Sequence, residues 1–117
     1  MKMFRQGDVL LINVTSMRLN REVAHAELSG RLKDVTPPDR IVLAFGEVTG
    51  HAHAIYPNKE GLLPAKLWDT GAERFLQVME KTELRHEEHA LIELDVGDYR
   101  VVRQREYTDD VERLVAD

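Results

Sequence analysis

The chain has 117 residues, of which 43% are hydrophobic, and a net charge of −5, which fits one compact domain with its own core. It has no cysteine, which excludes disulfides, thiolate metal sites and cysteine nucleophiles, and we expect a reducing, cytoplasmic setting. The acidic balance argues against broad binding to a nucleic-acid backbone. No stretch reaches the roughly 20 apolar residues that cross a bilayer, and charges interrupt the opening segment before a signal peptide could form.

Alternating apolar and polar residues, punctuated by turn residues, predict strands along most of the chain. The first strand is expected over residues 4–14, with Gly7 and Asp8 forming a bend or bulge. Further strands are expected over residues 40–45 and 51–56, and over 112–115 near the end. Two hairpins are predicted, one joining 65–68 to 74–79 and one joining 91–94 to 99–106.

Residues 17–29 break this pattern and predict one short helix or excursion. Leu19, Val23 and Ala26 recur at helical spacing, Ser16 is placed to cap the start, and Gly30 is placed to end it. The short links between strands favour antiparallel pairing. The fold class is therefore predicted as all-β, a mainly antiparallel small barrel or sandwich in a single domain spanning 1–117.

Four of the five histidines form two closely spaced pairs, His51 with His53 and His86 with His89. On a strand, residues two apart face the same side, so His51 and His53 are expected to project together. His86 and His89 are three apart, and a regular strand would send them to opposite faces. They can join the first pair only if Glu87 and Glu88 form a turn or bulge.

Two such pairs predict a metal site, because imidazole is a common ligand of transition metals. The donor set suits zinc, iron, manganese, nickel or copper. Glu47 and Glu88 are the candidate catalytic carboxylates, since an open coordination position would activate water. Four closed histidines would instead favour a structural or storage site, and an ordinary solvated histidine surface is the alternative to both.

The block GEVTGHAH, residues 46–53, resembles the first histidine motif of the cupin superfamily, which implies a barrel with histidine ligands. The family's glutamate does not follow at its usual spacing, and its second motif is not recognisable around His86. The chain also resembles a set of small uncharacterised bacterial and phage proteins. The shared blocks are RQGDVL, GEVTGHAH, HEEH and the tail that ends in QREY. That second resemblance implies membership and supplies no activity.

A second candidate surface is the arginine-rich segment over residues 99–107. A regular strand would place Arg103, Arg105 and Tyr107 on one face with Tyr99 and Val101. Such a face suits a nucleic-acid, phosphate or protein partner, and a cross-strand ladder of ion pairs is the ordinary alternative.

Two functions follow from these patterns. The first is a metal-binding β-barrel and possible metal-dependent enzyme of unknown substrate. The alternative is a non-enzymatic accessory module, encoded in a phage or an operon, that uses the arginine-rich strand. The partner is expected to be a small molecule or a protein, and the sequence is compatible with a homodimer.

Overall fold

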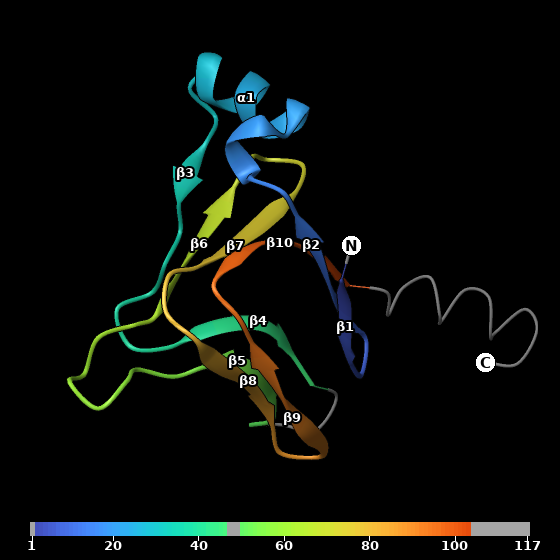
Figure 1. Cartoon of the computed structure of the whole chain (residues 1–117), viewed down its shortest axis with the longest axis vertical. Helices are drawn as coiled ribbons and strands as arrows, with labels where there is room; N and C mark the ends of the chain where they lie inside the picture. The colour runs from blue at the N-terminus through green and yellow to red at the C-terminus, as the bar shows by residue number, and fades with distance from the viewer. Residues whose placement is uncertain (1, 47–49, 104–117) are drawn as a thin grey trace, which may run out of the picture.

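Two antiparallel β-sheets share one core and form the body of the molecule (Figure 1). A computed structural model describes residues 2–46 and 50–103. The larger sheet has the strand order β1-β2-β10-β7-β6-β3, and the smaller sheet has the order β4-β5-β8-β9. The strands are β1 (Met3–Gln6), β2 (Val9–Val14), β3 (Lys33–Asp34), β4 (Ile41–Phe45), β5 (Ala52–Ile55), β6 (Ala65–Asp69), β7 (Arg74–Val78), β8 (Thr82–His86), β9 (His89–Leu94) and β10 (Gly97–Arg103). The predicted all-β class is confirmed.

The predicted first strand is two strands joined by a tight turn. Gln6 pairs with Val9 across Gly7 and Asp8, so β1 doubles back on β2. Gly7 has a φ of 58°, which suits the first central position of a two-residue hairpin turn. Val9 and Leu11 of β2 are buried in the shared core. The bend expected at this point therefore exists, but it reverses the chain.

One predicted hairpin is confirmed and the other is wrong. β6 and β7 pair antiparallel around residues 70–73. β9, by contrast, pairs with β8, and β10 pairs with β2 and β7 in the other sheet. Leu94 and Tyr99 are both buried, so the short link between them carries the chain across the core from one sheet to the other. The strand predicted over 112–115 lies outside the described residues.

Apolar residues from both sheets meet in the core. Its fully buried members include Leu11 of β2, Ile41 of β4, Ile55 of β5, Leu76 of β7, Leu84 of β8 and Leu94 of β9. Transfer of such side chains from water is the main favourable term in folding. One edge of this core is polar, and the histidines lie there.

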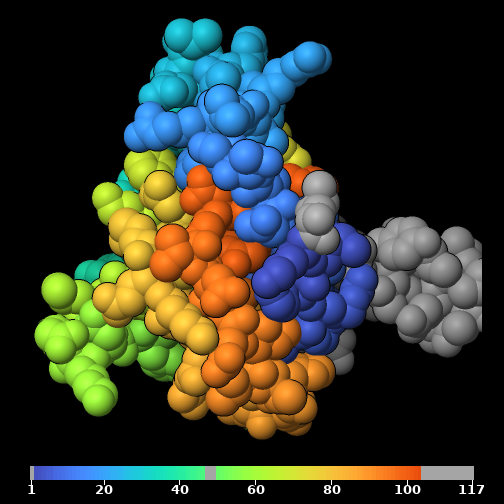
Figure 2. Space-filling view, in the orientation of Figure 1, coloured from blue at the N-terminus to red at the C-terminus, as the bar shows by residue number. Residues whose placement is uncertain are grey.

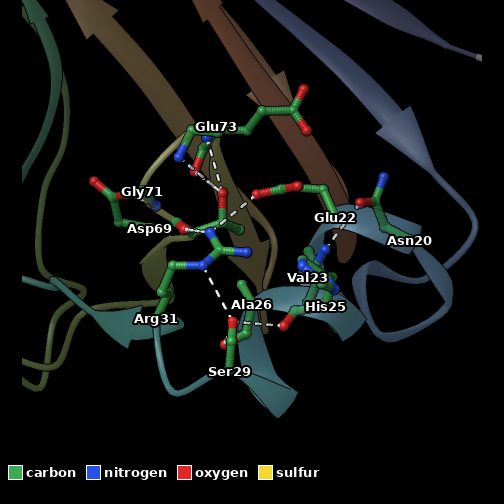
Figure 3. Close-up of polar contacts among 12 residues, drawn as sticks. Asn20, Glu22, Val23, His25, Ala26, Ser29, Arg31, Asp69, Gly71 and Glu73 are labelled. Carbon is green, nitrogen blue, oxygen red and sulfur yellow. Dashed lines mark hydrogen bonds and ion pairs between the residues drawn. The ribbon is translucent and has the colours of Figure 1, made fainter.

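The helical prediction is confirmed at residues 17–28. A short 3₁₀ turn, η1 (Met17–Leu19), is capped by Ser16 and leads into helix α1 (Arg21–Leu28). Arg31, just after the helix, donates a hydrogen bond of 2.6 Å to the Thr70 carbonyl and fastens this end to the β6–β7 turn (Figure 3). Within the described residues, no helix has the length and apolar character needed to cross a membrane.

Candidate functional site

The structure brings the four paired histidines together where β5 begins, β8 ends and β9 begins, at one end of these strands of the smaller sheet. The ring centroid of His86 lies 4.3 Å from that of His53, 4.6 Å from His89 and 5.8 Å from His51. The predicted turn at Glu87 and Glu88 is present, because β8 ends at His86, β9 begins at His89, and these two residues pair across it. We call His51, His53, His86 and His89 the histidine cluster.

The Glu87 side chain connects the segment that carries His86 and His89 to the segment that carries His51 and His53. β5 and β8 share the backbone pair Ala54 and Arg85, and the β8–β9 register shifts between Leu84 and His86. Beyond that bulge, the Ala52 N–H donates a hydrogen bond of 3.0 Å to the Glu87 carboxylate. This bond holds the pKa of Glu87 below its usual value. Glu87 therefore ties the hairpin turn to β5 at the residue between His51 and His53.

Gln6 fixes the orientation and the tautomer of His53. Its side-chain amide donates to the carbonyls of Leu84 and Ala90, at 2.9 and 3.0 Å. The amide oxygen therefore faces His53 Nδ1, 2.9 Å away, and must accept from it. His53 carries its proton on Nδ1, and Nε2 presents a lone pair whenever the ring is neutral.

Asp8 lies at that free nitrogen. Its Oδ1 is 3.3 Å from His53 Nε2, and its Oδ2 accepts a 3.0 Å hydrogen bond from Arg103 Nε. Burial acts to raise the pKa of Asp8, but the hydrogen bond and charge of Arg103, a local backbone hydrogen bond and the nearby His53 together outweigh it and hold the pKa below its usual value. Burial and the neighbouring histidines lower the pKa of His53. The site therefore pairs a carboxylate with a neutral imidazole.

His51 and His86 meet Glu88 on the opposite side of the cluster. His51 Nδ1 is buried and has no hydrogen-bond partner among the described residues. The nearest carboxylate oxygen, Glu88 Oε1, is 3.7 Å from it. His86 Nδ1 accepts a 3.0 Å hydrogen bond from the Glu88 backbone N–H, so neutral His86 carries its proton on Nε2.

Two glycines make room for the imidazoles. A Cβ atom on Gly7 would lie 2.8 Å from His89 Nε2 and 3.1 Å from His53 Cε1. A Cβ atom on Gly46 would lie 2.8 Å from His86 Nε2. Both distances are too short for carbon, so the backbone approaches the rings more closely there than a residue with a side chain would allow.

The cluster stops short of a formed metal centre. As the side chains stand within residues 2–46 and 50–103, no three His, Asp or Glu groups are arranged to hold one metal ion. The predicted carboxylate Glu88 lies beside His51, whereas Glu47 lies outside the described residues. The site also contains Gln6 and Asp8, which the sequence reading did not assign to it. The sequence predicted a bend at Gly7 and Asp8, but a bend alone does not show which residues its side chains contact.

The arginine-rich strand is engaged within the larger sheet. Tyr99 and Val101 are buried, so their face packs on the core. Arg100 pairs with Glu73 at 2.9 Å, and Arg103 binds both Asp8 and the Phe45 carbonyl. This arrangement matches the ion-pair alternative for the part of the strand that the structure describes. Arg105 and Tyr107 lie outside the described residues.

An open cleft of about 870 Å³ runs along β8 and reaches the cluster at His86. Its walls come from the loop after β5, including Tyr56 and Lys59, and from the start of β8, including Lys81 and Glu83. Side chains of both charge signs therefore line it. The cleft gives a small polar molecule a path to His86.

Comparison with known proteins identifies a family without assigning an activity. A family described as a domain of unknown function (DUF8820) matches residues 5–104, and the chain belongs to it. No curated protein and no solved structure matches the chain. The cupin likeness therefore stays a resemblance of eight residues.

Proposed function

We propose that this member of the DUF8820 family binds one divalent transition metal ion through the histidine cluster. The observation that carries the proposal is the buried His51 Nδ1, which has no hydrogen-bond partner among the described residues. In the same cluster Gln6 holds the proton of neutral His53 on Nδ1, so the lone pair of His53 Nε2 faces the Asp8 carboxylate, which is also an acceptor. An unpaired buried nitrogen costs free energy, and a metal ion would remove that cost.

The orientation of His53 by Gln6 supports the same proposal. In metal sites, a ligating histidine commonly donates its other ring N–H to a neighbouring acceptor, which fixes the ring and raises its basicity. Gln6 provides such an acceptor, and its own amide hydrogens are held by two backbone carbonyls. His53 is thus preorganised to bind through Nε2.

His86 is the residue that has to change on binding. Its Nδ1 accepts from the Glu88 N–H, and its Nε2 then carries the proton. A metal ion at Nδ1 would take the lone pair that accepts from the Glu88 N–H. A metal ion at Nε2 would require the proton of the neutral ring to move to Nδ1, which could then no longer accept that hydrogen bond. Metal binding at His86 is therefore expected to shift the Glu88 amide resonance in NMR spectra.

The proposal extends to metal-dependent catalysis at this site. With three histidines as ligands, a fourth coordination position would be left for water, and a zinc-like ion would lower the pKa of that water toward neutrality. His89 is on the exposed strand β9, and the open cleft adjoins His86. Both features favour an accessible site over a closed storage site.

The decisive experiment is metal analysis of protein purified without a histidine tag. We expect about one equivalent of zinc after dialysis against zinc and removal of the excess. His53→Ala is expected to abolish this binding, and His25→Ala is the matched control because His25 is an exposed histidine on α1, away from the cluster. Wild-type protein that retains no zinc, iron, nickel, copper or manganese would contradict the proposal.

A further inference from the structure

We propose that Asp8, and not Glu88, is a carboxylate ligand of this metal site, where it holds the ion together with His53. This inference rests on the proposed metal binding and adds a ligand from the other sheet. The sequence reading assigned the carboxylate role to residues next to the histidines. The contacts assign it to a residue more than 40 positions away in the chain, at the β1–β2 turn.

The first argument is the distance between the two ligand atoms. Asp8 Oδ1 and His53 Nε2 are 3.3 Å apart. Two donors that each lie about 2.0–2.2 Å from a tetrahedral ion are roughly 3.4 Å from each other. The pair therefore already has the separation of two ligands of one ion, without any movement of either side chain.

The second argument is that both atoms are acceptors. Gln6 holds the proton of neutral His53 on Nδ1, so Nε2 faces the carboxylate with a lone pair. Two acceptors at this separation repel unless a positive charge lies between them. A divalent cation satisfies both, and the negative carboxylate offsets its charge where four neutral imidazoles would not.

The third argument is that Asp8 is held in place from behind. Its other oxygen, Oδ2, accepts from Arg103 Nε, and Arg103 also donates to the Phe45 carbonyl at the end of β4. Arg103 thereby orients Asp8 toward His53 without occupying Oδ1. Gly7, the neighbour of Asp8, lies against His53 and His89 and leaves no side chain between the turn and the rings.

Glu88 lacks these features. Its carboxylate is 3.7 Å from His51 Nδ1 and its side chain is 57% exposed, against 24% for Asp8. An exposed, unrestrained carboxylate loses side-chain entropy when it is fixed on an ion. Asp8 is already fixed, so its contribution to binding is expected to be the larger one.

An ion held by Asp8 and His53 would also join the two sheets. Asp8 belongs to the β1–β2 turn of the larger sheet, and His53 belongs to β5 of the smaller one. In the space-filling view the dark blue N-terminal hairpin lies directly against the orange β8–β9 segment (Figure 2). Metal binding should therefore raise the unfolding temperature of the protein.

The test compares zinc binding by wild type, Asp8→Asn and Glu88→Gln, measured by competition with a chromophoric chelator and by thermal unfolding with and without zinc. Asp8→Asn keeps the shape of the side chain, and it is expected to weaken zinc binding about tenfold or more. The zinc-dependent rise in unfolding temperature should shrink accordingly. Glu88→Gln is expected to change affinity less than about twofold, because an exposed carboxylate contributes little.

The outcomes separate this inference from the proposal on which it depends. Wild-type protein that binds no metal refutes both. Wild-type binding that Asp8→Asn leaves unchanged refutes the role of Asp8 alone, as does a loss in Glu88→Gln equal to that in Asp8→Asn. Thermal unfolding of zinc-free Asp8→Asn shows that the variant is folded, and an NMR shift of His53 Nε2 on zinc addition reports ligation at that nitrogen directly.

Discussion

The arginine-rich strand and the histidine cluster both contact the turn at Gly7 and Asp8, yet their polar groups are used in opposite ways. On β10, Arg100 has Glu73 as its partner, and Arg103 has both Asp8 and a backbone carbonyl. In the histidine cluster, His51 Nδ1 has no hydrogen-bond partner among the described residues. Charged groups that pair with one another are already engaged, whereas a buried ring nitrogen without a partner is available to a ligand.

Asp8 connects the two regions, and this explains why both looked functional in the sequence. One of its oxygens completes the ion pair with Arg103, and the other faces His53. The arginine strand therefore supports the histidine cluster by holding its carboxylate. The following predictions test whether the two regions differ in this way, beginning with the largest expected effect.

Gln6→Ala should be the most destabilising of these changes. It would leave the Leu84 and Ala90 carbonyls and His53 Nδ1 without their partner, and buried polar groups left unpaired cost on the order of 3 kcal/mol in total. Urea denaturation measures the loss. Gln77→Ala is the matched control, because Gln77 accepts one hydrogen bond from Trp68 in the larger sheet, and about 1 kcal/mol is expected there. Equal losses would show that Gln6 has no special role at the cluster.

Acidification of the metal-free protein should lower its stability through His53. The pKa of His53 is depressed by burial, with His86 and His89 adding to the effect, so the unfolded state binds a proton more readily. The free energy of unfolding should therefore be highest above about pH 6.5 and decrease as the pH falls through the depressed pKa of the folded state.

Denaturation curves from pH 8 to pH 5, recorded with a chelator present, measure this decrease. His53→Gln should flatten the dependence, and His25→Gln on the exposed face of α1 should leave it unchanged. A wild-type curve without a decrease would contradict the assignment of His53 as a buried neutral histidine.

Local patterns predicted the secondary structure better than they predicted the tertiary arrangement. Alternation identified β4 to β7, β9 and β10, but it merged β1 and β2 into one strand and missed β3 and β8. The spacing of Leu19, Val23 and Ala26 identified α1. The second hairpin failed because Asp95 to Gly97 has the length of a hairpin turn, and only the burial of Leu94 and Tyr99 on both sides of it makes the chain cross the core. The length of a turn does not show whether the chain folds back as a hairpin or crosses to the other sheet.

For the site, the sequence predicted the gathering of the histidines and the turn on which it depends. It could not predict Gln6 and Asp8, because their contact with His53 depends on how one sheet packs on the other. The predicted metal and catalytic carboxylates stay predictions. The sequence alone reveals functional groups that lie close together in one segment, such as two histidines on one strand. Contacts between distant segments depend on the folded structure.

Glu87→Ala should loosen the join between the two histidine pairs with a smaller effect than Gln6→Ala. It removes the acceptor of the Ala52 N–H, so hydrogen exchange at that amide should accelerate, and zinc binding should weaken because the hairpin turn is less restrained. Glu87→Gln retains a carbonyl oxygen and should preserve most of the protection. Glu88→Ala is the control in the same turn, and unchanged exchange at Ala52 in Glu87→Ala would refute the role of Glu87.

Arg100→Ala should have the smallest effect, and it tests the other side of the comparison. Arg100 and Glu73 form a partly exposed pair, so its loss should cost about 0.5 kcal/mol at low salt and less at high salt. Urea denaturation at two salt concentrations measures this, and chelator competition should show unchanged zinc affinity. Arg100 donates to Glu73, whereas Arg103 donates to Asp8. If Arg100→Ala lost zinc binding as His53→Ala is expected to do, the arginine-rich strand and the histidine cluster would form one site. An unchanged affinity would instead restrict the support from β10 to Arg103.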